Sequence, residues 1–193
     1  MERVVHKAIK NYDFISTCYH EAGHTVIALL KAFRVTEVKV CSKNSGETYY
    51  TRPSFSNNKS RNKTIAVGEV SVLYSGIESE KILFQTLDSH NIIPRSIKNG
   101  SSSDFKSALW FIRKYDLAEP GKETTQFKSK IRSKLKNKIV RHWEDITLIS
   151  NALIKNKEIK YNRIKKILLT YSPNHLMWEK KFLRIENKFN SYE

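Results

Sequence analysis

Apolar residues recur every three or four positions over most of this chain, which is the spacing that buries one face of an α-helix. A first helix is expected over 14–33, with Asp13 as its N-cap. Residues 1–12 are mixed and polar and fit either a short helix or a tail. Further helices are expected over 64–86, from Asp104 to a break at 119–121, over 125–155, over 159–171, and around the apolar stripe of Trp178, Phe182, Ile185 and Phe189.

Two short segments follow the pattern of a β-hairpin instead. Residues 35–40 alternate between apolar and polar types, and residues 47–51 hold two tyrosines and two threonines, which favour strands. The stretch between them, 42–46, is rich in turn-forming residues. A polar loop is expected over 54–63. Gly76 inside the following helix indicates close backbone approach to a neighbouring helix, because glycine there costs about 1 kcal/mol relative to alanine.

These elements predict a mainly α (α+β) fold with a small β-hairpin beside the first helix. A chain of 193 residues is long enough for one sizeable core. The main domain is expected over 1–171, and 172–193 are expected to form a C-terminal helical extension that docks on the body or on a partner. No internal repeat or low-complexity linker divides the sequence.

The chain is strongly basic, with 35 Lys and Arg against 19 Asp and Glu and a formal net charge of +16. The lysines are densest over 122–138. Contact with nucleic acid or another anionic surface would explain this charge, but general use of Lys, Asn and Ile along the chain explains it better. No apolar run approaches a membrane span of about 20 residues, and the N-terminus has no secretory signal. Two cysteines make no disulfide framework, so a cytoplasmic location is predicted.

One motif carries specific chemistry. His20 and His24 frame an H-E-x-x-H pattern, and in a helix they lie one turn apart on the same face. Two imidazoles in this arrangement can bind one Zn²⁺, and Glu21 is placed to act as general base on a zinc-bound water rather than as a ligand. The pattern therefore predicts a zinc hydrolase site.

A catalytic zinc normally has a third protein ligand. The position at which metzincins carry a third histidine holds Leu30, which excludes that class. A carboxylate at a helix start beside a loop is the most favourable alternative, and Asp104 fits that description. The candidates considered are Glu69, Glu78, Glu80, Asp88, His90, Asp104, Asp116 and His142.

Four segments, in order, resemble the peptidase domain of the FtsH-type zinc metallopeptidases. CYHEAGHT at 18–25 resembles its "AYHEAGHA" helix, YSGIESE at 74–80 its "GGRAAE" helix, and GSSSD at 100–104 its "GASND" segment. Residues 142–154 resemble a late helix of that domain. The resemblance implies a helical zinc-peptidase domain in which His20, His24 and Asp104 bind zinc and Glu21 is the catalytic base. Glu80 is a further candidate, as the partner of a ligating imidazole.

The sequence departs from that family in several places. It contains no G-x-x-x-x-G-K-[ST] phosphate loop and no membrane helix, whereas family members carry an AAA ATPase module and membrane helices. Ser75 replaces the first glycine of "GGRAAE", and Ile77 replaces its arginine. The expected function is therefore a stand-alone, ATP-independent zinc metalloendopeptidase. Its substrates would be unfolded proteins or peptides, or proteins delivered by a separate ATPase or adaptor.

Two other functions stay open at this point. A peptidase-like adaptor would keep the fold and use its basic helices to bind a partner. A nucleic-acid-binding protein would use the basic residues over 122–138 and hold a non-catalytic metal, with weak, non-specific and salt-dependent binding. The complete set of His20, Glu21, His24 and Asp104 favours the peptidase.

Overall fold

The computed structural model describes residues 2–86, 102–118 and 124–190. It confirms a mainly helical fold with one small antiparallel sheet. The elements in chain order are α1 (Glu2–Leu30), β1 (Arg34–Ser42), β2 (Ser45–Thr51), α2 (Lys59–Thr86), α4 (Ser102–Lys114), α5 (Thr124–Arg141), α6 (Trp143–Asn156), β3 (Glu158–Lys160), α7 (Tyr161–Tyr171) and α8 (His175–Asn190). The break predicted at 119–121 and most of the loop predicted over 88–103 lie outside the described residues.

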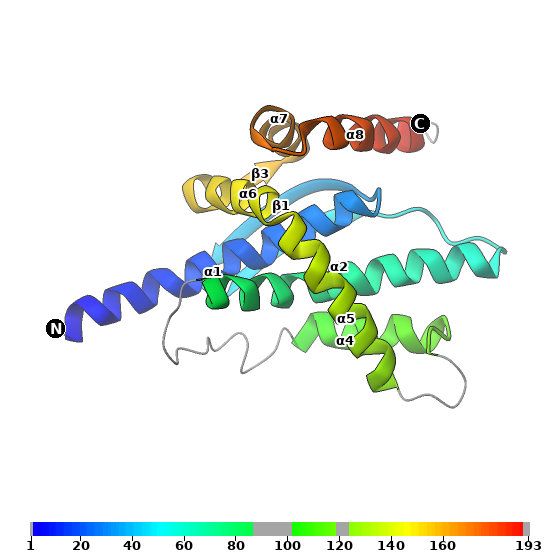
Figure 1. Ribbon diagram of the computed structural model, residues 1–193, viewed down its shortest axis with the longest axis horizontal. Coiled ribbons are helices and arrows are strands. Elements are labelled where there is room, and N and C mark those ends of the chain that lie inside the picture. Colours follow the sequence, from blue (N-terminus) through cyan, green and yellow to red (C-terminus); the bar gives the residue numbers. More distant parts are fainter. Residues whose placement is uncertain (1, 87–101, 119–123, 191–193) are drawn as a thin grey trace.

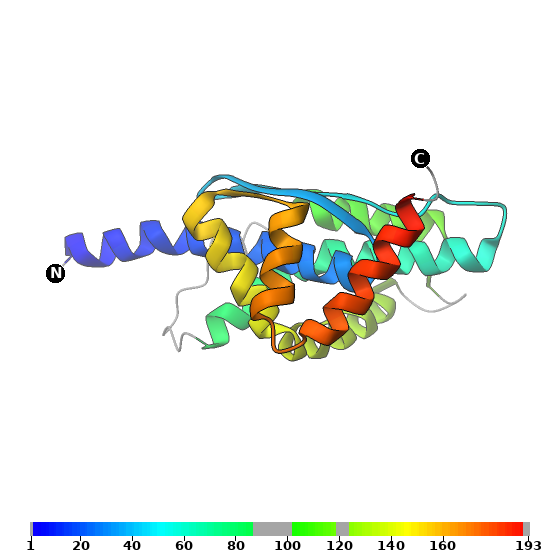
Figure 2. The same cartoon turned by 90° about the horizontal axis from the view of Figure 1, so that it is seen from above.

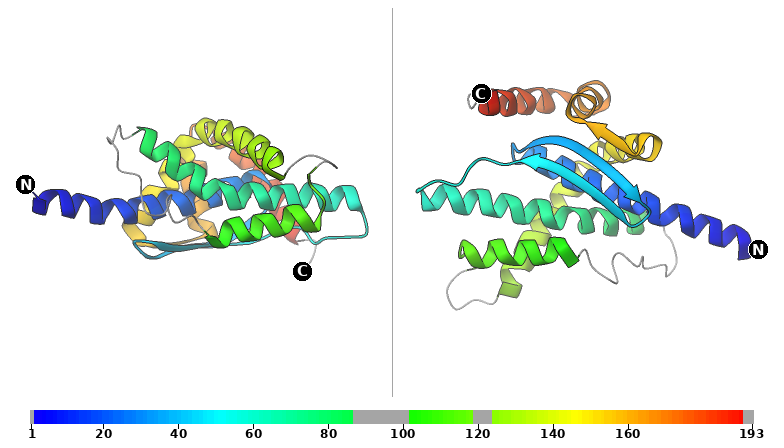
Figure 3. Two further views of the ribbon diagram at one scale, coloured as in Figure 1. Left: turned by 90° about the horizontal axis from the view of Figure 1, so that it is seen from below. Right: turned by 180° about the vertical axis from the view of Figure 1, so that it is seen from behind.

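The fold is organised around α1 and α2, which pack side by side (Figure 1). The sheet covers one side of this helix pair, and α5 crosses the other side (Figure 2). Seen from behind, β2 is the strand nearest to α4, and α4 lies along α2 (Figure 3). The start of α4 and the hairpin therefore come together over the middle of α1.

Helix α1 begins at Glu2, so the prediction of Asp13 as its N-cap is wrong. Residues 2–12 continue the helix, and the backbone carbonyl of Asp13 accepts a hydrogen bond from Thr17 inside it. The helix ends three residues before the predicted Phe33. Ala32 has a left-handed φ of 56°, and Phe33 N–H bonds the Ala28 carbonyl at 3.0 Å. This is a Schellman motif with alanine at the left-handed position. Glycine usually occupies that position, so the sequence did not indicate that the helix ends here.

The predicted hairpin is confirmed as β1 and β2, but the sheet has a third strand that the sequence pattern did not predict. The strand order is β2-β1-β3, with both pairings antiparallel. The predicted helix over 159–171 in fact begins at Tyr161, because β3 takes up its first residues. Lys157, at a left-handed φ of 60°, turns the chain from α6 into this strand.

The single helix predicted over 125–155 is wrong, because the chain bends at His142 between α5 and α6. His142 Nδ1 bonds Asp145 Oδ2 at 2.8 Å, and the buried Asp145 carboxylate also accepts hydrogen bonds from Ser172 and Asn174. This network joins α6 to the turn before α8. The apolar stripe continues through the bend, so the periodicity did not reveal it.

Helix α2 begins at Lys59, inside the loop predicted over 54–63. Asn58 Oδ1 accepts a hydrogen bond from the Arg61 backbone N–H at 2.9 Å, which is the contact of an N-cap residue. At the other end of the chain, α8 docks on the body of the molecule. Trp178, Phe182 and Ile185 are buried in the same apolar core as α1, and Lys181 Nζ donates to the Leu30 carbonyl at 2.9 Å. Among the described helices, none has the length and apolar character needed to cross a membrane.

Candidate metal centre

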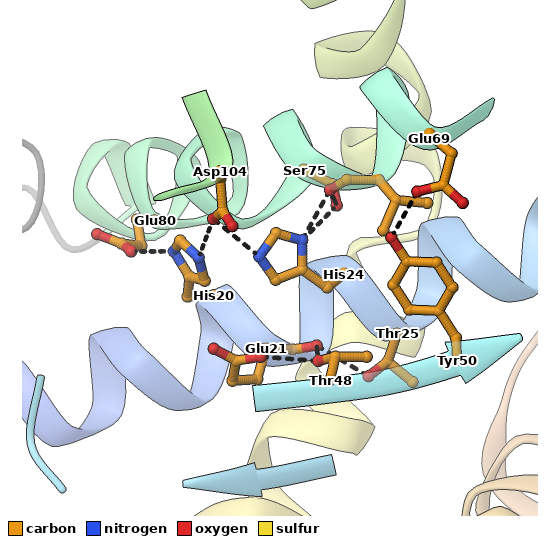
Figure 4. A network of polar contacts seen from close by, with 11 residues as sticks. His20, Glu21, His24, Thr25, Thr48, Tyr50, Glu69, Ser75, Glu80 and Asp104 are labelled. Carbon is orange, nitrogen blue, oxygen red and sulfur yellow. Dashed lines mark hydrogen bonds and ion pairs between the residues drawn. The ribbon is translucent and has the colours of Figure 1, made fainter. Parts of the chain in front are cut away.

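His20 and His24 lie one turn apart on α1, and their ring centroids are 4.6 Å apart. Both rings direct Nε2 toward Asp104, in the first turn of α4 (Figure 4). The distance from Asp104 Oδ2 is 3.2 Å to Nε2 of His20 and 3.4 Å to Nε2 of His24. Three potential donor atoms from two helices therefore face a common point.

The other nitrogen of each imidazole is held by α2. Glu80 Oε1 contacts Nδ1 of His20. Nδ1 of His24 donates to the Val72 carbonyl at 2.7 Å, with the Ser75 hydroxyl 3.4 Å away. These contacts fix the orientation of both rings and leave Nε2 as the atom that faces Asp104.

Glu21 approaches from the side of the hairpin. Its side chain is buried, and the Thr48 hydroxyl on β2 donates to Oε2 at 2.7 Å. Gly46 makes room for this carboxylate, because a Cβ at that position would lie 2.5 Å from Glu21 Cγ. The hairpin thus fixes the direction of the Glu21 side chain.

His20, Glu21 and His24 can hold a metal ion. Each offers a ligand atom, and these atoms lie within 4.8 Å of one another. Asp104 adds a second carboxylate that faces both histidines. The two carboxylates differ in their surroundings: Glu21 accepts a hydrogen bond from Thr48, whereas Asp104 contacts the two imidazoles.

The electrostatics of the group are those of a tightly coupled cluster. Burial by itself lowers the pKa of His20, but hydrogen bonds to Asp104 and Glu80 outweigh it and raise this pKa to about 10. Burial raises the pKa of Asp104, and the two histidines outweigh that effect, so its pKa falls below the usual range. Without a metal, positive charge on His20 therefore balances the buried carboxylates; a divalent cation would take over this role.

The remaining candidates for a third ligand are engaged elsewhere. Glu69 accepts a hydrogen bond from the Tyr50 hydroxyl at 2.9 Å, and Glu78 pairs with Arg132 at 2.6 Å. His142 is bonded to Asp145, and Asp116 lies in an exposed turn after α4. Asp88 and His90 lie outside the described residues. Among the described candidates, Asp104 faces both histidines.

Two groups at this site had no signal in the sequence. Thr48 orients Glu21, and the Val72 carbonyl orients His24. Both belong to elements that come close to α1 only in the folded chain, and neither residue type is unusual at its position in the sequence.

Two glycines lie where α1 and α2 pack together. The prediction that Gly76 allows close backbone approach of a neighbouring helix is wrong in its detail, because the group that approaches Gly76 is a side chain of α1. A Cβ on Gly76 would lie 2.4 Å from Nε2 of His20, and a Cβ on Gly23 would lie 2.8 Å from the Ser75 carbonyl oxygen. The imidazole of His20 thus occupies the space that a side chain at position 76 would take.

We expect Gly76→Ala to weaken metal binding at least about tenfold. The added methyl displaces the His20 ring, even though alanine favours the helix by about 1 kcal/mol. Gly68→Ala is the matched control on α2, because its Cβ would meet the Phe33 ring instead, at 2.9 Å. Metal affinity of both variants can be measured by competition with a chromophoric chelator. Equal affinities for Gly76→Ala and the parent chain would contradict this packing.

No protein-family model matches the chain, and a search of curated proteins found no match either. The resemblance to FtsH-type peptidases thus stays a prediction from sequence.

Proposed function

We propose that the chain is a zinc-dependent metalloendopeptidase, with His20, His24 and Asp104 as zinc ligands and Glu21 as general base. The observation that carries this proposal is the spacing of the donor atoms, 3.2 Å and 3.4 Å from Asp104 Oδ2 to the two Nε2 atoms. Tetrahedral zinc with ligands at about 2.0–2.1 Å needs donors about 3.3 Å apart. Two imidazoles and one carboxylate also match the donor set of catalytic zinc sites.

The contacts behind the ligands support the same assignment. Zinc-binding histidines typically donate their second ring N–H to a carboxylate or a backbone carbonyl. His20 has Glu80 in this position, and His24 has the Val72 carbonyl. Both rings are therefore oriented with Nε2 toward Asp104, and Nε2 of His20 would become a lone-pair donor when a bound metal displaces its proton.

When bound, Zn²⁺ supplies a coordinated water of pKa near 7 and polarises the carbonyl of the scissile bond. Glu21 takes the proton of the attacking water and passes it to the leaving amide nitrogen. Thr48 holds the Glu21 carboxylate through one oxygen, Oε2, so that the other oxygen is available for proton transfer. Burial of Glu21, with 4% of its surface exposed, limits competition from bulk water.

Strand β2 supports an extended substrate. It lies at one edge of the sheet and pairs with β1, and within the described residues no strand pairs with its other edge. An unfolded peptide can add to that edge through backbone hydrogen bonds and pass beside Glu21. The substrates are therefore unfolded segments, including those that a partner protein delivers.

Hydrolysis of casein, an unfolded protein, tests the function. The zinc-loaded chain is expected to cleave it, a chelator is expected to stop cleavage, and added zinc is expected to restore it. A tightly folded protein without loose segments should survive. Full zinc occupancy without cleavage of any unfolded substrate would contradict the peptidase and favour a binding role.

Replacing Glu80 with glutamine is expected to lower zinc affinity about 10- to 100-fold, the usual effect of losing the carboxylate partner of a ligating histidine. Glutamine keeps the size of the side chain but removes the charge that contacts His20. Glu78→Gln is the matched control, because Glu78 lies on the same helix and pairs with Arg132 instead. Zinc competition assays on both variants measure the difference. An equal loss of zinc affinity in Glu78→Gln would contradict a specific contact of Glu80 with the ligating His20, and would instead indicate a general effect on the stability of α2.

A further inference from the structure

A cluster of aromatic side chains lies where β2 ends and α4 ends. Phe55 stacks on Tyr115 with ring centroids 4.6 Å apart, and Trp110 meets Phe111 edge-on at 4.9 Å. Arg52 lies 4.9 Å from the Phe55 ring centroid. We call these four rings, Phe55, Trp110, Phe111 and Tyr115, the aromatic surface.

The aromatic surface is accessible at Trp110, and the other rings hold it in place. Half of the surface of Trp110 is exposed (50%), and Lys114 Nζ lies 4.3 Å from its ring centroid. Phe111 is buried beneath and anchors the group. Arg52 pairs with the buried carboxylate of Glu69 at 3.3 Å, and this ion pair holds its guanidinium over the Phe55 ring. Trp110 is the exposed ring, and Phe55 and Tyr115 beside it are partly exposed. An exposed tryptophan held among other aromatic rings is a common feature of binding surfaces.

This surface is continuous with the candidate metal centre along two elements. Helix α4 has Asp104 in its first turn and Trp110 and Phe111 in its C-terminal half. Tyr115 follows directly after the last residue of the helix. Strand β2 places Thr48 at Glu21 and leads directly to Arg52. Four residues of extended chain cover about 13 Å, so a peptide along β2 passes from Glu21 to the aromatic surface within about four residues.

We propose that the aromatic surface binds aromatic side chains of an extended substrate, about three to five residues from the scissile bond. The inference rests on the proposed peptidase function and deepens it by naming the substrate class. A strand that adds antiparallel to β2 runs from Arg52 toward Thr48, so the recognised residues lie on the N-terminal side of the scissile bond. Substrates rich in Phe, Tyr and Trp are therefore preferred, as in the exposed cores of unfolded proteins.

The observations favour a peptide over single-stranded nucleic acid, which can also stack on aromatic side chains. The path from the metal centre to the aromatic surface carries Glu21, Glu69 and Asp104, whose carboxylates accept hydrogen bonds and offer no donor to a phosphate group. Arg52 is already paired with one of them. The dense lysines of α5 lie on another helix, which crosses the opposite side of the α1–α2 pair from the sheet (Figure 2).

A binding experiment tests the proposal without requiring cleavage. The zinc-loaded Glu21→Gln variant is titrated into a dye-labelled unstructured peptide that carries two phenylalanines, and into the same peptide with alanines in their place; fluorescence anisotropy reports binding. The phenylalanine peptide is expected to bind about tenfold tighter. Adding Trp110→Ala to the variant is expected to remove most of this preference. Tyr171→Ala is the control, because Tyr171 is 67% exposed on α7, away from α4 (Figure 1).

Three results would overturn the proposal: equal affinity for the two peptides, full retention of the preference in Trp110→Ala, or an equal loss in Tyr171→Ala. Trp110-dependent binding of an oligothymidine strand, without a preference between the peptides, would instead assign the surface to nucleic acid. Thermal unfolding of each variant checks that the fold is intact.

Mapping of cleavage sites separates this proposal from the peptidase function itself. In products of the wild-type chain, aromatic residues are expected to be enriched three to five residues before the cleaved bonds, and Trp110→Ala should flatten that enrichment. Cleavage without enrichment would overturn the aromatic subsite and leave the peptidase standing. Absence of cleavage together with Trp110-dependent peptide binding would overturn the peptidase and leave a peptide-binding surface.

Discussion

Replacing Glu21 with glutamine is expected to lower hydrolysis of casein by at least about 100-fold, which is the usual contribution of a general base. Glutamine has nearly the same size and still offers an oxygen to the Thr48 hydroxyl, which donates to Glu21 at 2.7 Å. It has no basic oxygen that can take a proton from water. Because Glu21 is not a zinc ligand in this scheme, zinc content should stay at about one ion per chain.

Glu47→Gln is the matched control for this variant. Glu47 is an exposed glutamate on β2, next to Thr48, and its carboxylate contacts Tyr49. The control should keep full activity, since it makes the same chemical change outside the site. Equal hydrolysis by Glu21→Gln and the wild-type chain would contradict the assignment of the base. Loss of zinc from Glu21→Gln would instead identify Glu21 as a ligand.

The second large effect is expected at Asp104. Replacing it with alanine removes the one carboxylate that faces Nε2 of both His20 and His24 among the described candidates. Zinc affinity should fall by more than about 100-fold, because even outer partners of ligating histidines contribute 10- to 100-fold. Zinc content after dialysis against a weak chelator, measured by atomic emission, reports the loss, and hydrolysis should fall with it.

Glu179→Ala provides the comparison. It also replaces an acidic residue with alanine, but Glu179 is exposed on α8 and is not one of the residues of the candidate metal centre. Its zinc content should match that of the wild-type chain. Undiminished zinc in Asp104→Ala would refute Asp104 as a ligand and direct attention to Glu21, whose carboxylate lies within 4.8 Å of the imidazole donors.

Local sequence patterns were enough to predict the elements that position the site. The H-E-x-x-H pattern lies on a helix as expected, and the alternation over 35–40 and 47–51 forms the hairpin beside it. Both depend on side-chain periodicity, which is a local property. The bend at His142 and the strand β3 depend on contacts between distant segments. Asp145 reaches Ser172, and Ile159 pairs with Val38 of β1.

The candidate site also combines features that local sequence predicts with features that arise only from contacts between distant segments. Spacing alone brings His20 and His24 together, because four residues make about one helical turn. Reasoning from the residues favoured Asp104 but left seven other candidates open, since nothing local places α4 beside α1. The contacts of Thr48 and Val72 with the site arise only from packing of the hairpin and α2 on α1. A resemblance to a known family can supply such distant partners, whereas periodicity cannot.

A crystal structure of the zinc-soaked chain, with anomalous data collected on both sides of the zinc absorption edge, tests the central claim most directly. One anomalous peak is predicted, within about 2.0–2.2 Å of Nε2 of His20, Nε2 of His24 and a carboxylate oxygen of Asp104. The Glu21 carboxylate should lie outside this distance, within reach of a water on the ion. A peak elsewhere, or zinc bound directly by Glu21 with Asp104 turned away, would contradict the account.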